Sequence, residues 1–228
     1  MENMPYKIAV VDDIPDAREM MADTIIDAKK KPIIIDSVSN NINEFINRIR
    51  SESEGAIFDQ RLKPQNFANF DGAEAVAKLY DFDFPSILVT SITNPDIDEI
   101  RPLRRKIPIL IANGEPDAGL IIDGFRICVA EFKNHFIPER KPRKALIRIE
   151  EIDQDNSLSF IVVPSWDPNL KVRLPLDILT NKINQTLEEG MRLFAEINIG
   201  ASNHEELYFE NIRLAEEPSG EYAKFLHP

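Results

Sequence analysis

The chain of 228 residues has a formal net charge of −12, with 43% hydrophobic and 29% charged residues. This composition is typical of a globular protein with one or two domains, and the acidic balance argues against general binding to nucleic acid or to anionic membranes. No apolar run approaches the roughly 20 residues of a membrane-spanning helix. A single cysteine excludes an internal disulfide. The first residues lack the basic and apolar regions of a signal peptide, so we expect a cytoplasmic protein.

Strand and helix patterns alternate over the first 134 residues. Five buried strands are predicted from short apolar runs at residues 7–11, 33–35, 56–59, 86–90 and 107–111. Five helices are predicted at residues 15–30, 40–50, 73–80, 94–102 and 116–132. This alternation predicts crossover connections and a parallel sheet. We therefore expect residues 1–134 to form an α/β domain with a doubly wound, five-stranded sheet of flavodoxin-like order.

The pattern changes after residue 134. Residues 135–143 contain two prolines and several basic side chains, and we expect an exposed linker there; contact of these charges with an anionic partner is the alternative. Short strands are then predicted at residues 145–149, 158–163, 172–176, 192–198 and 207–214, with a helical turn at residues 183–190. Residues 144–228 are thus expected to form a small, mostly β barrel or sandwich domain.

The charge of this second domain limits its partners. Residues 144–228 hold 8 Lys and Arg against 15 Asp and Glu, a net charge of −7. This balance disfavours binding of oligonucleotides, and the segment has no recognition-helix pattern. We therefore expect an output or interaction domain that binds protein rather than DNA.

Acidic residues close the first and third predicted strands. Asp12 and Asp13 follow residues 7–11, and Asp59 ends the run at residues 56–59. These strands are neighbours in the expected sheet, and ligands bind outside the carboxyl ends of such strands. Three carboxylates that meet there need a cation. Mg²⁺ suits them because it prefers oxygen ligands, keeps several waters and can neutralise a phosphoryl group. An acidic turn cluster that faces solvent is the alternative.

Residues 5–134 resemble the receiver domain of two-component response regulators. The resemblance rests on four motifs: Val10-Val11-Asp12-Asp13 with Arg18 in the helix that follows, Ile57-Phe58-Asp59, Asp71-Gly72, and Leu88-Val89-Thr90-Ser91. It implies a protein that accepts a phosphoryl group and is not a turnover enzyme.

The resemblance also implies roles for particular residues. Asp59 would accept the phosphoryl group of a phosphohistidine, carried by a sensor histidine kinase or a phosphotransfer protein. Mg²⁺ would be bound by Asp12, Asp13, Asp59 and the backbone carbonyl of Arg61. The hydroxyl of Thr90 would turn toward the phosphate. The downstream protein effector is not implied by any motif.

Three features depart from the pattern of the family. The fifth strand ends in Ile111-Ala112-Asn113-Gly114 where receivers have Lys-Pro, so the cation that pairs with the phosphate is missing. The loop after Asp59 is long, and Lys63 or Arg61 within it is a candidate to supply that charge. Pro102 should end the fourth helix early, which puts the usual dimer face of the family in doubt.

These departures keep two alternatives open. One is a pseudo-receiver, a fold kept as an unphosphorylated scaffold for protein interaction. The other is a phosphoaspartate-type hydrolase, because aspartate nucleophiles also end parallel strands. Such enzymes generally need an acid/base aspartate two residues after the nucleophile, where this chain has Arg61. Elsewhere, Cys128 is predicted to be a core residue rather than a nucleophile, and Trp166 to anchor a loop rather than bind a ligand.

Overall fold

The computed structural model describes residues 4–63, 67–91, 94–112 and 116–215. The chain divides into two compact units, residues 1–140 and 141–228, which we call the N-terminal and C-terminal units. None of the helices in the described ranges has the length and apolar character that crossing a membrane requires.

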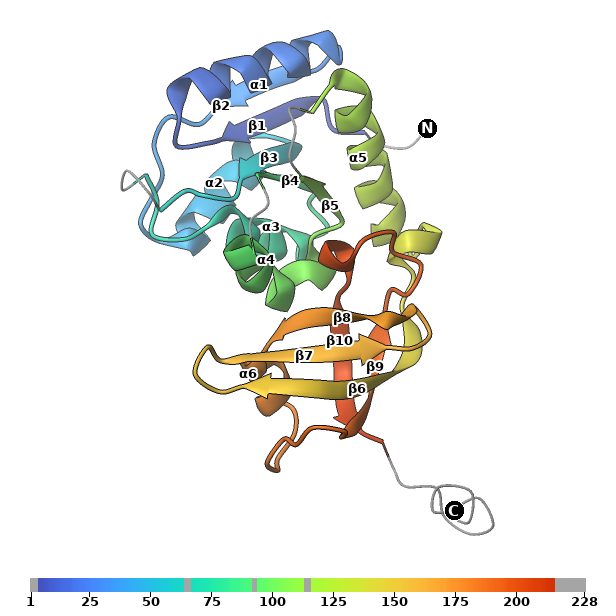
Figure 1. The fold of residues 1–228 in the computed structure, drawn as a ribbon. Helices are drawn as coiled ribbons and strands as arrows, with labels where there is room; N and C mark the ends of the chain where they lie inside the picture. The colour runs from blue at the N-terminus through green and yellow to red at the C-terminus, as the bar shows by residue number, and fades with distance from the viewer. Residues whose placement is uncertain (1–3, 64–66, 92–93, 113–115, 216–228) are drawn as a thin grey trace, which may run out of the picture. The chain divides into compact units, whose positions relative to one another are not determined.

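The N-terminal unit alternates strands and helices along the chain (Figure 1). Its strands are β1 (Lys7–Val11), β2 (Lys31–Ile34), β3 (Gly55–Asp59), β4 (Ser86–Thr90) and β5 (Ile109–Ala112). Its helices are α1 (Pro15–Asp27), α2 (Ile42–Glu52), α3 (Gly72–Tyr80), α4 (Asn94–Ile100) and α5 (Ala118–Phe132), with 3₁₀ turns η2 (Arg101–Lys106) and η3 (Pro138–Arg140). The strands pair in parallel in the order β2-β1-β3-β4-β5, so the predicted flavodoxin-like sheet is confirmed.

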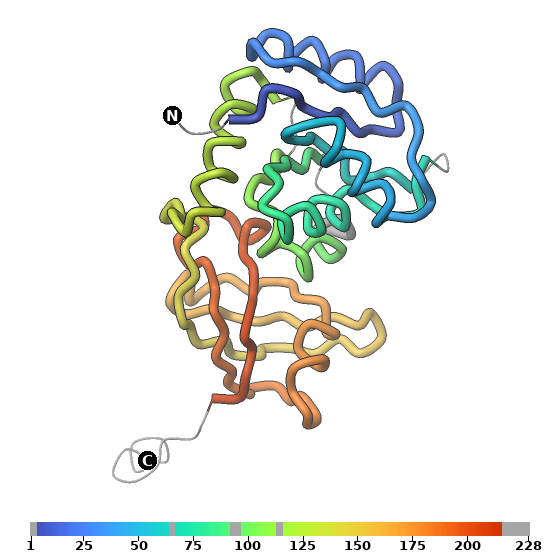
Figure 2. The backbone as a smooth tube through the Cα atoms, turned by 180° about the vertical axis from the view of Figure 1, so that it is seen from behind, coloured from blue at the N-terminus to red at the C-terminus, as the bar shows by residue number. Residues whose placement is uncertain are grey.

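Two apolar cores cover the two faces of this sheet. On one face α2 and α3 pack through Phe45 and Val76 against strand residues such as Phe58. On the other face Ile25 of α1 and Phe125 of α5 pack on the alternate residues of the same strands. Figures 1 and 2 show the sheet between these two layers of helices from opposite sides. The strands are apolar on both faces because both are buried.

Local chemistry explains where several elements begin. The side chain of Asn41 accepts hydrogen bonds from the first backbone N–H groups of α2, and Asp117 does the same for α5. Pro15 starts α1, where its missing N–H is not needed. Pro32 lies in β2, and the sheet tolerates it because β2 is an edge strand.

Helix α4 and strand β5 differ from the sequence prediction in their bounds. As predicted, Pro102 marks the end of the α-helix, but the chain continues as the 3₁₀ turn η2. Ile107 closes that turn, which delays β5 to Ile109. In α1, Ile25 and Met21 pack on the core of the unit, whereas Met20 is 50% exposed and Arg18 is buried.

The loop after β3 contributes to the core. Leu62, Ala68 and Phe70 are buried within it. The rings of Phe70 and Phe45 have centroids 5.4 Å apart. This long loop is therefore anchored by apolar packing as well as by its ends; its residues 64–66 lie outside the described ranges.

The predicted exposed linker is wrong at Arg140. Only 3% of this residue is exposed, and its guanidinium pairs with Glu131 of α5 at 2.8 Å. The segment 138–140 forms η3 rather than an extended linker. Arg140 was predicted to face solvent because no sequence pattern indicates that it pairs with a buried carboxylate.

The C-terminal unit contains one antiparallel five-stranded sheet, which confirms the expected β-rich domain. Its strands are β6 (Arg143–Asp153), β7 (Leu158–Val163), β8 (Asp167–Pro175), β9 (Arg192–Ile197) and β10 (Phe209–Leu214), in the order β10-β9-β6-β7-β8. One short helix, α6 (Leu176–Thr180), follows β8, and a 3₁₀ turn, η4 (His204–Glu206), precedes β10. The predicted helical turn at residues 183–190 is not helical.

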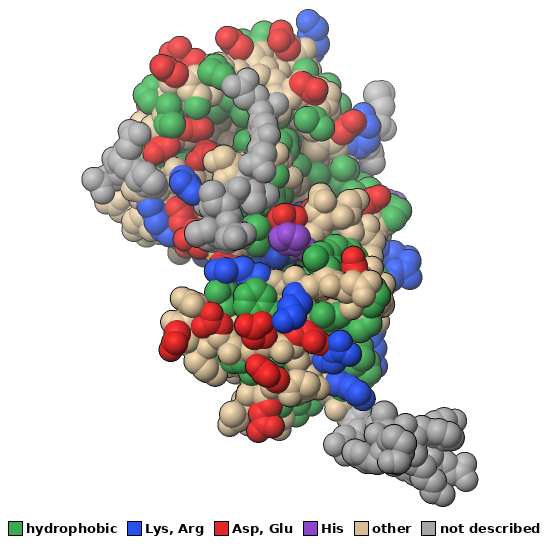
Figure 3. All heavy atoms as spheres, viewed as in Figure 1, with side chains coloured by type: hydrophobic (Ala, Val, Ile, Leu, Met, Phe, Trp, Pro, Cys, Tyr) green, Lys and Arg blue, Asp and Glu red, His purple; other side chains and the backbone are tan. Residues whose placement is uncertain are grey.

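This second unit has an apolar core of its own. Ile147, Ile161 and Leu193 are fully buried in it, together with side chains from α6 and the loops. Trp166 packs against this core, and its ring N–H donates to the carbonyl of Ala201 at 2.7 Å, as expected for a loop anchor. Figure 3 shows Asp and Glu side chains beside one another on the visible face of this unit, with Lys and Arg among them.

Candidate functional site

The ends of β1 and β3 bring the predicted acidic residues to one edge of the sheet. Val11 is the register partner of Phe58, so Asp12 and Asp59, the next residues, leave neighbouring strands side by side. All three carboxylates are half-buried. The negative charges of Asp12 and Asp13 both act on Asp59, so the three carboxylates lie near one another at the carboxyl end of the strands; we call this group the acidic pocket.

Asp59 carries the most perturbed carboxylate of this pocket. Burial raises its pKa to about 6, and the charges of Asp12 and Asp13 add to this effect. The backbone N–H of Arg61 opposes the rise by donating to Oδ2 of Asp59 at 2.6 Å. This hydrogen bond also turns the carboxylate in a fixed direction at the end of β3.

Asp12 is held by the turn that leads into α1. Its Oδ1 accepts from the backbone N–H of Ile14 at 2.8 Å. Burial raises the pKa of Asp12, and the charge of Asp13 raises it further, while the N–H of Ile14 and the positive charge of Arg18 lower it. Ile14, rather than Asp13, occupies the N-cap position of α1.

Arg18 lies beneath the acidic turn. Its guanidinium donates to the backbone carbonyl of Asp12, and only 9% of the residue is exposed. The same group lies over the ring of Phe67, 5.3 Å from the centroid. Arg18 therefore joins the turn after β1 to the long loop after β3.

Gln60 and Gly72 hold helix α3 against the acidic pocket. The buried Gln60 accepts from the N–H of Gly72 through its backbone carbonyl (3.0 Å) and from the N–H of Ala73 through its side chain (3.1 Å). Its own N–H donates to the carbonyl of Val89 on β4 at 3.0 Å. A Cβ on Gly72 would overlap the carbonyl oxygen of Asp59, so only glycine permits this close approach.

Lys63 does not stand free to supply the missing charge. Its ammonium pairs with Asp71 at the start of α3 and with Glu74 at 3.2 Å. These bonds, that to Asp71 above all, raise the pKa of Lys63. The ammonium of Lys63 is therefore already paired with the carboxylates of Asp71 and Glu74. Arg61 contacts Asp59 through its backbone N–H, which donates to the carboxylate of Asp59.

Thr90 ends the neighbouring strand β4. It pairs with Ala112, the last residue of β5, and only 4% of Thr90 is exposed. A small apolar residue, Ala112, is therefore the register partner of Thr90 at the end of the fifth strand. Asn113 and Gly114, the next two residues, lie outside the described ranges.

The residues of the pocket fit a hard divalent cation by their chemistry. Asp12 and Asp59 have raised pKa values because their charges are partly buried and close to another carboxylate; a bound cation relieves both effects. Within the described residues, no three His, Cys, Asp or Glu side chains already stand in the arrangement of a metal site. Asp12, Asp13 and Asp59 therefore do not form a ready three-carboxylate site in the structure; Mg²⁺ keeps several waters and can be bound by fewer carboxylates.

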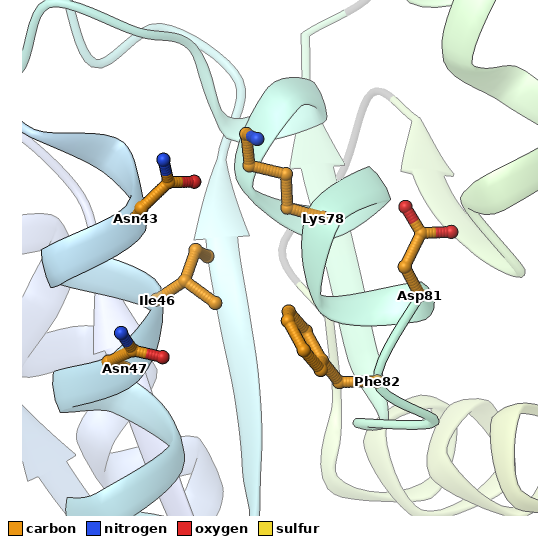
Figure 4. A pocket seen from close by; sticks show the side chains of 6 residues that line it. All are labelled: Asn43, Ile46, Asn47, Lys78, Asp81 and Phe82. Atoms are coloured by element: carbon orange, nitrogen blue, oxygen red, sulfur yellow. The ribbon is translucent and has the colours of Figure 1, made fainter.

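Two of the hollows that the described residues line lie on the surface of the N-terminal unit. One of about 380 Å³ opens beside Asp12 and is lined by Asp12, Ala17, Met20, Met21, Asp23, Thr24, Val89 and Pro116. The other, of about 290 Å³, lies between α2 and the end of α3 (Figure 4). It is lined by Asn43, Ile46, Asn47, Lys78, Asp81 and Phe82 and contains none of the predicted site residues.

The remaining candidate nucleophile is inert. Cys128 is fully buried, and burial raises the pKa of its thiol to about 12. Its Sγ donates to the carbonyl of Ser86 at 3.4 Å. The prediction of a core residue is therefore confirmed.

Sequence reasoning missed Gln60 and Phe67 as parts of the site. Gln60 directly follows Asp59, but a lone Gln after a strand carries no signal of burial. Phe67 lies in an irregular loop whose apolar residues follow no helical or strand spacing, so no periodicity points to it. Both act through the local folding of the loop.

No protein-family model and no curated protein matches the sequence. Solved structures similar to the chain include the receiver domain of NtrX from Brucella abortus, with 18% identity and a TM-score of 0.40 over 52% of this chain and 95% of that domain. A response regulator receiver domain protein from Clostridium thermocellum has 11% identity and a TM-score of 0.43, over 56% of this chain and 97% of that one.

NtrX from the same Brucella species is similar at 17% identity, with a TM-score of 0.42 over 56% of this chain. The chain spans 28% of that protein. The matched part is the N-terminal half of the chain, and the matched structures are receiver domains of response regulators.

Proposed function

We propose that the chain is a response-regulator-like protein that accepts a phosphoryl group on Asp59 in the cytoplasm. The donor is the phosphohistidine of a sensor histidine kinase or of a phosphotransfer protein. One observation carries the proposal: the half-buried Asp59, with its pKa raised to about 6, ends β3 beside Asp12 and Asp13. Perturbed carboxylates grouped at the carboxyl edge of a parallel sheet are characteristic of functional sites.

The pocket suits nucleophilic attack by a carboxylate. An oxygen of Asp59 bonds to phosphorus while the bond between phosphorus and the imidazole nitrogen of the donor breaks, and the nitrogen keeps the electron pair. A pKa of about 6 leaves Asp59 mostly ionised at neutral pH, so the nucleophile needs no separate base. The N–H of Arg61 orients the carboxylate throughout.

Asp12, Asp13, Asp59 and the backbone carbonyl of Arg61 are the proposed ligands of Mg²⁺. The bound ion supplies positive charge next to the transferred phosphoryl group. Thr90 is the proposed switch hydroxyl, since it ends β4 next to the acceptor strand. Asp59 accepts and later loses a phosphoryl group without turning over an external substrate.

The C-terminal unit is proposed to bind a downstream protein. Residues 144–228 carry a net charge of −7, which repels a phosphate backbone, and the sheet of this unit offers antiparallel strands rather than a helix that enters a groove. Its effector is therefore a protein rather than nucleic acid.

A second candidate function is a pseudo-receiver that acts as an unphosphorylated scaffold for protein interaction. The observation that favours it is the pairing of Thr90 with Ala112 at the end of β5, where a receiver has its lysine. Lys63 does not replace that cation in the structure, because it pairs with Asp71 and Glu74.

Labelling by acetyl phosphate separates the two functions. The full chain is incubated with acetyl phosphate and Mg²⁺, beside a known receiver as a positive control, and weighed intact by mass spectrometry. We expect one added phosphoryl group on the wild type and none on Asp59→Asn. Asp27→Asn, an exposed carboxylate at the end of α1, should label as the wild type does.

The opposite result is equally clear. If the wild type gains no phosphoryl mass while the control receiver is labelled, the phosphoacceptor function is wrong. The scaffold function then predicts that a partner captured by the wild type binds Asp59→Asn with unchanged affinity.

A further inference from the structure

Arg140 is the last residue of the N-terminal unit. All three nitrogens of its guanidinium donate hydrogen bonds within that unit. Nε and Nη2 donate to the two carboxylate oxygens of Glu131 at 3.0 and 2.8 Å. Nη1 donates to the backbone carbonyl of Arg104 at 3.2 Å, and Nη2 donates to that of Arg105 at 2.7 Å. A two-pronged Arg–carboxylate pair is the strongest common form of charged hydrogen bonding.

Glu131 collects donors from further elements of the unit. Its Oε1 also accepts from Arg105 of η2 at 2.8 Å and from the hydroxyl of Tyr80, at the end of α3, at 3.0 Å. Glu131 and Arg140 are each only 3% exposed. One carboxylate thus joins α3, η2, α5 and η3, and its removal leaves buried positive charge behind.

The first strand of the C-terminal unit begins shortly after this cluster. Arg143 already pairs with Ile197 in the sheet of the C-terminal unit. Only Lys141 and Pro142 lie between the buried Arg140 and that strand. Proline fixes its own φ angle and restricts the residue before it.

We propose that Arg140 and Glu131 form a clamp that fastens the connecting segment to the N-terminal unit. The sequence predicted a linker of nine residues, 135–143. With the clamp closed, the connecting segment that remains between Arg140 and strand β6 is reduced to Lys141 and Pro142. This inference does not depend on phosphorylation of Asp59.

Limited digestion of the full chain with trypsin tests the clamp. Trypsin cuts after Arg140 only when this side chain leaves Glu131 and enters the protease, so the rate reports opening of the clamp. The bond after Lys141 precedes proline and resists trypsin. A fragment of residues 1–140, identified by its mass, therefore records the event without ambiguity.

Two variants keep a cleavable residue at position 140. Glu131→Gln should raise the initial rate of cleavage there by about tenfold or more, because the buried guanidinium loses its counter-charge. Arg140→Lys keeps the charge but loses the planar fork, and it should raise the rate by a smaller factor. The matched control is Asp123→Asn, the same chemical change on the same helix in an exposed pair with Arg126, which should stay within about twofold of the wild type.

Cleavage after Lys78 of α3, followed in the same digest, reports unfolding of the whole unit. The clamp is supported if cleavage after residue 140 rises in both variants while cleavage after Lys78 does not follow. It is overturned if the wild type is cut at residue 140 as fast as the variants. It is also overturned if both sites accelerate by the same factor in Glu131→Gln, since Glu131 then supports only the general core.

Discussion

At the scale of single residues, the acidic pocket stores unfavourable charge. Asp59 is half-buried beside Asp12 and Asp13, and its pKa rises from 3.8 to about 6 on folding. The folded chain therefore holds this proton more tightly than the unfolded chain does. Between these two pH values the free energy of unfolding falls as the pH rises, and above pH 6 the full loss is present.

Replacing this carboxylate should stabilise the fold. In the absence of divalent cations, Asp59→Asn should raise the free energy of unfolding at pH 7.5 by about 1 to 2 kcal/mol, because each pKa unit corresponds to about 1.4 kcal/mol and partial exposure reduces the effect. The gain should shrink at pH 4, where folded Asp59 is protonated. Denaturant titration at both pH values measures it.

The same titration tests the cation site. Mg²⁺ should stabilise the wild type and leave Asp59→Asn nearly unchanged, so that the difference between them narrows. Equal stability of the two proteins at pH 7.5 without Mg²⁺ would show that the pocket carries no charge strain.

Sequence patterns located the acidic residues but not their supports. Asp12, Asp13 and Asp59 end recognisable strands, and parallel strands 1 and 3 are neighbours in a flavodoxin-like sheet. The contacts of Arg18 with Asp12 and Phe67 depend on the path of a long loop. That path follows from packing across distant segments, which periodicity does not encode.

At the scale of elements, the contact between β3 and α3 fixes the position of Asp59. Gly72 lies against the backbone of Asp59, and a Cβ there would also come within 2.9 Å of Leu88. Because backbone atoms cannot move aside as a flexible side chain does, the first turn of α3 would have to shift away from β3.

Gly72→Ala should therefore destabilise the N-terminal unit by about 1 to 3 kcal/mol, the usual cost of overpacking. Gly119→Ala in α5 is the matched control, since a Cβ there meets only the Asp117 side chain at 3.1 Å, and alanine favours the helix. Thermal unfolding compares the two variants. A Gly72→Ala protein as stable as the wild type would contradict the close approach.

Elements with strong periodicity could be predicted from the sequence, whereas the short helical turns could not. Strands β1 and β4 have the predicted bounds. The 3₁₀ turn η2 and the short helix α6 were missed, because a few residues give too little pattern to separate a helical turn from a strand end.

At the scale of the whole molecule, each unit has a hydrophobic core of its own. Ile147 is fully buried in the core of the C-terminal unit. Ile147→Ala should cost that unit about 2 to 5 kcal/mol while Asp59 still accepts a phosphoryl group at the rate of the wild type. Unfolding followed by the fluorescence of Trp166, the single tryptophan, measures the loss. A labelling rate that falls in parallel would contradict the independence of the two units.

The single cysteine gives the molecule a built-in reporter. Cys128 is fully buried in the N-terminal unit and is the chain's one thiol. An alkylating reagent therefore reaches it only during transient opening of that unit, whatever the state of the other. Counting alkylated molecules over time, directly in a cell extract, would follow how often the N-terminal unit opens, without purification of the protein.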